Sequence, residues 1–340
     1  MSEDEPADLA AVRRLHALSD LVTPMALRVL VSLGLPGLLR DRPRTAAELA
    51  RLTSTDARIL TGILDHLASR DVVRAGPDGR YRLTVLGRAA CDAPGPSPQS
   101  WLIGSLRLGT LSGDVNHSVV ALLDVVRSGR TGLEEQHGES VWSRVARMDL
   151  GEARTVFGHR TPVVDFAPIE KLIRARAPRT VCDVGAGTGR LARELLSRDL
   201  CAHCDLVDLA PMSRLAGEQL DGIDPGRWRI HEADFMTGPL PPADLHVLCD
   251  VLADWPDEDA VQLLGVVAKA GPAVLVTQLV LPSRAGDLFD PTAGRLRLDI
   301  EMARPTRTVE DMCALATAAG LRPVSEETTA LRSAVLLEAA

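Results

Sequence analysis

Apolar residues recur at helical spacing through the first part of the chain. Over residues 10–39 they repeat every three or four positions, which predicts helical structure with a local break at Pro24. The capping-box sequence at residues 45–48 predicts a second, short helix that runs to about Leu52. The chain therefore begins with a helical segment.

The next segment predicts a winged-helix module. Residues 56–69 place five apolar side chains on one helical face, and Ser54 or Thr55 is the expected helix cap. A Pro-Asp-Gly turn then separates two short strands, at 72–74 and 80–83. Helix, turn, helix and hairpin in this order are typical of a winged helix.

Two functions compete for this module, DNA binding and dimerisation. A DNA-binding helix needs several cations for phosphate contacts, but residues 56–69 offer only Arg58 and His66 near their exposed face. The formal net charge of −8 also weighs against a nucleic-acid partner. We therefore expect residues 1–98 to form a dimerisation domain. A DNA-binding regulator that senses a nucleoside is the alternative.

The hydrophobic period changes in the second half of the chain. A Pro/Gly-rich boundary at 92–98 precedes a mostly helical segment, 99–176, which is interrupted at the glycine-rich residues 129–138. From Arg179 short apolar strands alternate with helices, which predicts an α/β domain with a doubly wound, mostly parallel sheet over residues 177–340. The seven expected strands are residues 181–184, 206–209, 228–231, 245–248, 274–281, 321–325 and 334–337.

The first of these strands runs into a glycine-rich turn. Alternating glycines at 185–189 let a ligand approach the backbone more closely than a Cβ atom permits. Asp208 ends the second strand, where a carboxylate can accept hydrogen bonds from both ribose hydroxyls. Asp234 and Phe235 follow the third strand and can hold an adenine. The spacing Gly-x-Gly-x-Gly lacks the glycine that seats a pyrophosphate, so a nucleoside without a diphosphate fits better than NAD or FAD.

Composition and length add limits. The 340 residues suggest two domains, and 46% hydrophobic with 25% charged residues is ordinary for globular proteins. No uninterrupted apolar run reaches the ~18 residues of a membrane span, so we expect a cytoplasmic protein without a membrane partner. Cys201 and Cys204 flank His203, but no second ligand pair follows, so we expect buried thiols and no metal.

Six segments together resemble the bacterial small-molecule O-methyltransferases of the acetylserotonin/caffeate type, in the branch that tailors polyketide antibiotics. The resemblance covers nearly the whole chain. It implies a homodimer held by the N-terminal domain, a Rossmann-like domain that binds S-adenosylmethionine, and a small secondary metabolite in a cleft lined by residues 99–176. The matching segments are residues 20–28, 183–189, 207–209, 233–235, 239–241 and 251–260.

The resemblance also implies roles for single residues. Gly185 and Gly187 would line the methionine end of the cofactor, Asp208 would bind the ribose, and Asp234 with Phe235 would bind the adenine. The remaining residues expected at the cofactor are Asp183, Leu209, Cys249 and Arg154, the last near the cofactor carboxylate.

The chain departs from the family at the catalytic base. Many relatives carry a His where this chain has Ala253, and alanine cannot accept a proton. We expect methyl transfer to a hydroxyl by proximity and alignment. A hydroxylase, decarboxylase or cyclase that retains the cofactor is the alternative. Candidate replacement bases are His159 and Asp250, whereas His246 is expected to be a buried, neutral imidazole.

A second departure concerns the substrate pocket. Relatives carry an Arg where this chain has Glu301, and the following loop is shortened here to residues 303–305. The chain contains only nine aromatic residues, so a pocket for a planar aromatic substrate would depend on Met and aliphatic contacts. A substrate that is not aromatic is the alternative. The sequence therefore predicts an altered substrate pocket.

Overall fold

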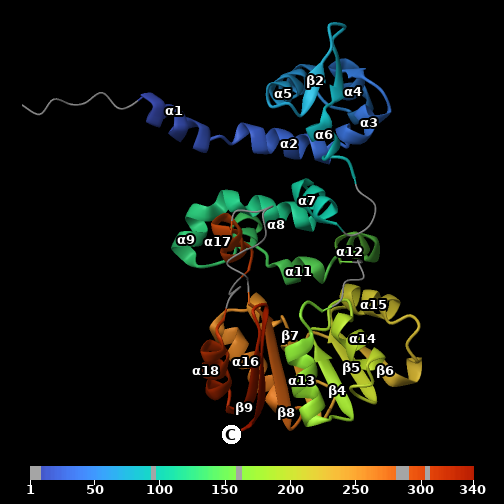
Figure 1. Ribbon diagram of the computed structural model, residues 1–340, viewed down its shortest axis with the longest axis vertical. Helices are drawn as coiled ribbons and strands as arrows, with labels where there is room; N and C mark the ends of the chain where they lie inside the picture. The colour runs from blue at the N-terminus through green and yellow to red at the C-terminus, as the bar shows by residue number, and fades with distance from the viewer. Residues whose placement is uncertain (1–8, 93–96, 158–162, 281–290, 303–306) are drawn as a thin grey trace, which may run out of the picture. The chain divides into compact units, whose positions relative to one another are not determined.

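The computed structural model describes residues 9–92, 97–157, 163–280, 291–302 and 307–340. The chain forms two compact units, Met1–His117 and Ser118–Ala340 (Figure 1). The sequence predicts a division of the chain into residues 1–98, 99–176 and 177–340, and this division remains a prediction.

The N-terminal unit contains the expected winged helix (Figure 1). Its hairpin strands pair antiparallel, and a two-residue strand adds to the same small sheet. The elements in chain order are α1 (Leu9–Leu18), α2 (Val22–Ser32), α3 (Leu35–Asp41), β1 (Arg44–Thr45), α4 (Ala46–Thr53), α5 (Ala57–Ser69), β2 (Val73–Ala75), β3 (Arg80–Leu83), α6 (Val85–Arg88), α7 (Pro98–Leu106) and α8 (Leu111–His117).

Local hydrogen bonds explain where these helices begin. The capping box is confirmed, because Glu48 accepts from the Thr45 N–H at 2.7 Å while Thr45 accepts from the Glu48 N–H at 3.2 Å. The cap expected at Ser54 or Thr55 is wrong: Asp56 accepts from the Ile59 N–H instead. The break expected at Pro24 is also misplaced. The helices α1 and α2 are separated at residues 19–21 instead. Pro24 lies in the first turn of α2, where its missing N–H costs no helical hydrogen bond.

The stretch Leu9–Ser32 has an apolar, exposed surface. By length and composition alone it would be long and apolar enough to cross a membrane. The 18 residues within it that carry this signal have a mean hydropathy of 1.2, and 22% of them are buried. The stretch contains no uninterrupted apolar run of that length, because four charged residues lie within it: Arg13, Arg14, Asp20 and Arg28. Leu15, Leu18 and Leu21 are each about 70% exposed. Such a surface is typical of a helix that packs against another protein surface.

The C-terminal unit opens with short helices that end at glycines. Gly129 and Gly138 adopt positive φ angles at the ends of two of them. The interruption predicted over 129–138 is therefore only partly right, because a helix occupies Gly132–His137 and the breaks lie on either side of it. A later helix, α17 (Pro291–Glu301), packs against this group. The opening elements are η1 (Ser118–Ala121), α9 (Leu122–Ser128), α10 (Gly132–His137), α11 (Val141–Val145) and α12 (Leu150–Phe157).

The rest of this unit is built on a seven-stranded sheet in the order β6-β5-β4-β7-β8-β10-β9. The first five strands in this order run parallel, whereas β10 is antiparallel to both of its neighbours. All seven expected strands are confirmed. Their bounds are β4 (Thr180–Val184), β5 (His203–Asp208), β6 (Trp228–Glu232), β7 (Leu245–Cys249), β8 (Ala273–Leu279), β9 (Leu321–Thr328) and β10 (Arg332–Ala339).

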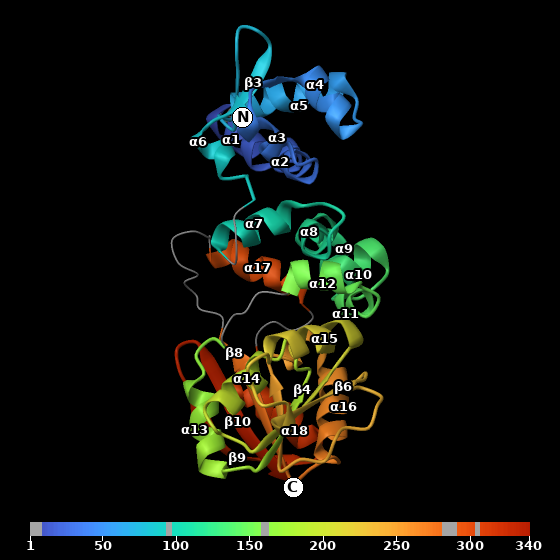
Figure 2. The same ribbon diagram turned by 90° about the vertical axis from the view of Figure 1, so that its right-hand side faces the viewer.

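Helices cover both faces of the sheet, with α13 and α16 on opposite sides (Figure 2). One apolar cluster joins the sheet to the helices that connect β4, β5 and β6, and the other joins it to the helices beyond β7. Cys204 is fully buried at the start of β5, as expected. The covering helices are α13 (Ala167–Arg176), α14 (Arg190–Ser197) and α15 (Ala210–Gln219) on one face, and α16 (Asp257–Ala268) and α18 (Val309–Ala318) on the other.

The strand order reverses between β4 and β7. The chain builds β4, β5 and β6 outward in one direction and then returns to place β7 and β8 on the other side of β4. In open α/β sheets this reversal leaves a crevice at the carboxyl ends of the two central strands, where ligands bind. The glycine-rich turn after β4 and the turn after β7 both lie at this crevice.

Candidate cofactor and substrate site

The glycine-rich turn has the backbone that only glycine adopts readily. Gly185, Gly187 and Gly189 have φ angles of +72°, +56° and +75°. A Cβ atom on Gly185 would lie 2.7 Å from a methyl group of Val251, whereas one on Gly187 would meet nothing within 4 Å. The turn therefore presents bare backbone to open space at Gly187 and packs closely against Val251 at Gly185.

Asp208 is held rigidly at the end of β5. It is 7% exposed, and its Oδ2 accepts from the Gly187 N–H at 2.6 Å while its Oδ1 accepts from the Leu209 N–H at 2.7 Å. Burial raises the pKa of this carboxyl, although the two backbone N–H groups oppose the shift. These bonds fix the side chain beside the glycine turn.

A cavity of about 340 Å³ opens beside Asp208. It brings together six of the expected cofactor residues, from the ends of three strands. Those residues are Gly185, Gly187, Asp208, Leu209, Asp234 and Phe235. Its other lining residues are Ser140, Trp142, Ser143 and Ala146 at α11, and Val251, Asp254 and Trp255 after β7.

Aromatic side chains form part of this wall. Phe235 and Trp255 meet edge to face, with ring centroids 6.2 Å apart and an interplanar angle of 83°. Trp142 lines the same cavity from α11. Three of the nine aromatic residues of the chain therefore gather here. No sequence pattern indicates Trp142, which lies more than forty residues before the glycine turn.

A smaller cavity of about 90 Å³ shares Gly185 and Gly187 with the larger one. Asp183 and Cys249, both expected at the cofactor, lie here and not in the larger cavity. Its charged lining residues are Asp183, Arg190, Asp250 and Arg332.

Asp183 is the unusual acid of the smaller cavity. It is 1% exposed, and its Oδ2 has no hydrogen-bond partner within the described part of the chain. Burial, and then the nearby charge of Asp208, raise its pKa to about 7. The backbone N–H of Ala192 bonds to this carboxyl and opposes the rise in its pKa. A buried carboxylate oxygen without a partner is still costly, so a cationic ligand at Oδ2 would be stabilising.

Arg154 lies apart from these cavities. Its guanidinium pairs with Glu218 of α15, with Nε 3.1 Å from Oε2, and it lines neither of the two. A contact between Arg154 and the cofactor remains a prediction.

The turn after β7 carries the position of the family His. Ala253 is 4% exposed in η3 (Leu252–Asp254) and has no group that can accept a proton. The next residue, Asp254, lines the larger cavity, and burial, followed by Asp250 and Asp208, raises its pKa to about 7. Sequence reasoning missed Asp254, although it lies directly beside the recognised alanine.

Arg307 fixes the conformation of this turn. Its side chain is 2% exposed and donates to the carbonyls of Leu252 and Trp255, the latter at 2.7 Å, and to Asp257 Oδ1 at 2.9 Å. These bonds satisfy backbone carbonyls on both sides of Asp254. The turn that presents Asp254 to the cavity is therefore anchored from the segment that leads into α18.

The structure describes two of the other titratable residues considered as bases, Asp250 and His246, but not His159. Asp250 pairs with Arg332, so both of its carboxylate oxygens already accept hydrogen bonds. His159 and the shortened loop at 303–305 lie outside the described residues. His246 is fully buried, as expected, and its Nε2 lies 2.9 Å from the Pro241 carbonyl. Burial lowers its pKa, which favours the neutral imidazole. Within the described ranges, no three His, Cys, Asp or Glu side chains gather as a metal site.

Family models match most of the chain. An O-methyltransferase domain model matches residues 120–322, and an O-methyltransferase dimerisation domain model matches residues 15–91. The chain belongs to the O-methyltransferase family. The winged-helix block is thus the dimerisation domain of this family, and the exposed stretch Leu9–Ser32 falls largely within it.

Relatives from antibiotic pathways are similar along nearly the whole chain. Aclacinomycin 10-hydroxylase of Streptomyces purpurascens is 32% identical and covers 96% of this chain and 88% of its own. The 2,7-dihydroxy-5-methyl-1-naphthoate 7-O-methyltransferase of Streptomyces carzinostaticus is also 32% identical, and the match covers 90% of this chain and 92% of the relative.

A solved structure has the same fold. The O-methyltransferase of neocarzinostatin biosynthesis, in complex with S-adenosyl-L-homocysteine and 1,4-dihydroxy-2-naphthoic acid, superposes with a TM-score of 0.77 at 28% identity. The match covers 96% of this chain and 98% of that one. S-adenosylmethionine is therefore the cofactor of this O-methyltransferase, and the bare glycine turn beside Asp208 fits an adenosyl group.

Proposed function

We propose that this enzyme transfers a methyl group from S-adenosylmethionine to a hydroxyl of a small secondary metabolite, and that it works as a homodimer. The observation that carries the proposal is the larger cavity. It combines the glycine turn and Asp208 with Asp254, an acid whose pKa of about 7 suits proton transfer. The naphthoate O-methyltransferase relative supports a hydroxyl as the acceptor.

The two cavities divide the cofactor between them in this proposal. The adenosine lies in the larger one, where Asp208 accepts from the ribose hydroxyls and Asp234 with Phe235 binds the adenine. The amino-acid end enters the smaller one, where the unpartnered Asp183 Oδ2 accepts from its ammonium group. Gly185 and Gly187 line both cavities, which suits a ligand that passes from one to the other.

Catalysis then depends on alignment and on one proton acceptor. The bound cofactor supplies an activated methyl group on a sulfonium. The protein holds the acceptor hydroxyl in line with that methyl and excludes water, which lowers the barrier by proximity. The Asp254 carboxylate would accept the proton that the acceptor hydroxyl loses. Asp254 thus accepts the proton that a His accepts in many relatives and that Ala253 cannot accept.

A second candidate function is hydroxylation with the cofactor retained. The observation that favours it is the similarity to aclacinomycin 10-hydroxylase over 96% of this chain, together with alanine at the position of the family His. In that case the cofactor would serve as a charged element of the pocket and not as a methyl donor.

Mass spectrometry separates the two functions. The enzyme is incubated with S-adenosylmethionine that carries a deuterated methyl group and with a panel of hydroxylated naphthoates and anthracyclines. The proposal expects a product that gains one labelled methyl, which Asp208→Asn prevents. A product that gains oxygen without the label supports the second candidate and contradicts the first.

A further inference from the structure

A buried guanidinium lies in the wall of the smaller cavity and has no part in the proposed mechanism. Arg332 is the first residue of β10 and is 1% exposed. It is the largest fully buried side chain that the structure describes. A cation at this depth is tolerated only when it is paired and its N–H groups are satisfied, so its surroundings decide its role.

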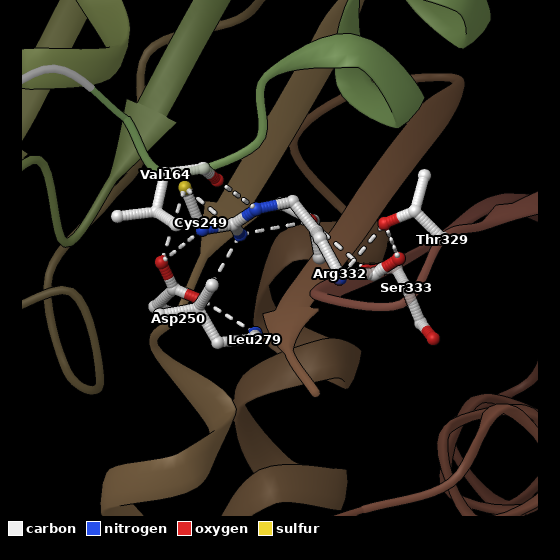
Figure 3. A network of polar contacts seen from close by, with 8 residues as sticks. Val164, Cys249, Asp250, Leu279, Thr329, Arg332 and Ser333 are labelled. Carbon is white, nitrogen blue, oxygen red and sulfur yellow. Dashed lines mark hydrogen bonds and ion pairs between the residues drawn. The ribbon is translucent and has the colours of Figure 1, made fainter. Parts of the chain in front are cut away.

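Arg332 forms a fork with the carboxylate of Asp250 (Figure 3). Its Nη1 lies 3.0 Å from Asp250 Oδ1 and its Nη2 lies 2.9 Å from Oδ2. Nη1 also donates to Thr277 Oγ1 at 3.1 Å. This planar geometry is specific to arginine. One side chain thus links β10 to β8 and to the end of β7.

Asp250 sets the direction of the chain as it leaves β7. Its φ of +64° is uncommon for a residue with a side chain, and it is stabilised from β8. Leu279 N–H donates to Asp250 Oδ1 at 2.9 Å, and the Asp250 N–H donates to the Thr277 carbonyl at 2.8 Å. The residue before this bend, Cys249, lines the smaller cavity, and the residue after it, Val251, lines the larger one.

The same guanidinium holds the opposite wall. Its Nε donates to the carbonyl of Val164 at 2.9 Å, and Val163 and Val164 both line the smaller cavity. Close by, the hydroxyl of Thr329 donates to the carboxylate of Asp165. The hairpin of β9 and β10 therefore fixes the segment that precedes α13.

We propose that Arg332 is a positioning residue that sets the two walls of the smaller cavity for the amino-acid end of the cofactor. It acts through Asp250 and Val164, and it does not itself contact the cofactor. Both oxygens of Asp250 are engaged, so the pair supplies a fixed shape and not a free charge. This inference rests on the proposed placement of the cofactor's amino-acid end.

Two ligands test it when titrated calorimetrically into the full-length protein. S-adenosylhomocysteine carries the amino-acid end, and 5′-methylthioadenosine keeps the adenosine and the thioether without it. Arg332→Met is expected to weaken binding of S-adenosylhomocysteine about tenfold and to change the affinity for methylthioadenosine less than about threefold. Arg332→Lys is expected to lie between, because an ammonium cannot make the planar fork.

Arg227→Met is the matched control. Arg227 donates to the carbonyl of Cys201 at 2.9 Å, before the start of β5 and at the other end of the strands from the cavities. Its loss is expected to lower stability and to leave the preference for S-adenosylhomocysteine unchanged.

The outcomes separate this inference from the proposed function. If the wild type binds both ligands equally well, the proposed placement of the amino-acid end is wrong. If the wild type prefers S-adenosylhomocysteine and Arg332→Met keeps that preference, or loses both affinities equally, the role of Arg332 is wrong. If Arg332→Met does not fold, Arg332→Lys decides. A preference for S-adenosylhomocysteine over methylthioadenosine equal to that of the wild type overturns the inference, and a reduced preference supports it.

Discussion

The two cavities that meet at the glycine turn are built on different principles. The larger one has aromatic and backbone walls with Asp208 and Asp254 along them, and Asp208 is oriented by backbone N–H groups. The smaller one is lined by four charged residues, two of which form a buried ion pair. The difference shows that an acid can be oriented by backbone N–H groups, as Asp208 is, or by a buried ion pair, as Asp250 is.

The strongest test of the larger cavity is Asp254→Asn. An amide cannot accept the hydroxyl proton, so kcat for methyl transfer is expected to fall by about 10²–10⁴-fold. The wild-type kcat is expected to rise with pH through about 7, where the Asp254 carboxyl deprotonates, and the variant is expected to lose this rise. The measurement is a pH profile of kcat with an acceptor found by mass spectrometry. An unchanged profile in the variant would remove Asp254 from the mechanism.

Asp208→Ala tests recognition of the ribose. Loss of the carboxylate removes charge-assisted hydrogen bonds to the ribose, so binding of S-adenosylhomocysteine is expected to weaken about 100-fold. The readout is calorimetric titration. The control is Asp199→Ala, since this acid is 83% exposed and pairs with Arg227 away from both cavities. Equal effects of the two substitutions would argue against a specific role for Asp208.

Gly185→Ala tests the bare backbone at the junction of the cavities. A methyl group there would lie 2.7 Å from Val251, and the positive φ adds strain, so affinity for S-adenosylhomocysteine is expected to fall about tenfold. Gly222→Ala is the control for strain alone, because its φ is +86° and nothing lies within 4 Å of its Cβ. A similar loss of affinity in both variants would show that strain, not the close approach, matters.

The charge of Asp183 is expected to lower the stability of the ligand-free enzyme. Its pKa rises from 3.8 to about 7 on folding, so its own contribution favours the folded state below about pH 4 and is lost as the pH rises through about 7. Asp183→Asn removes the charge but leaves a buried amide, so the free energy of unfolding at pH 8 is expected to rise by only about 1 kcal/mol. Chemical denaturation at pH 5 and pH 8 measures this. A variant less stable than the wild type at pH 8 would contradict the assignment.

Features that depend on contacts between neighbours in the sequence could be predicted, whereas features that depend on contacts between distant segments could not. The strands, the glycine turn and Asp208 were predictable because each depends on neighbours a few residues away. Trp142 and Arg332 were not, because α11 and β10 reach the cavities only when the sheet is assembled. The misplaced break at Pro24 has a local cause, since proline suits the first turn of a helix.

The most direct test is a crystal structure of the enzyme with S-adenosylhomocysteine. We predict that the Asp208 carboxylate lies within hydrogen-bonding distance of both ribose hydroxyls, and that the amino-acid end enters the smaller cavity with its ammonium group at Asp183 Oδ2. A ligand whose ribose lies away from Asp208, or whose amino-acid end points out of the smaller cavity, would contradict the division of the cofactor between the two cavities.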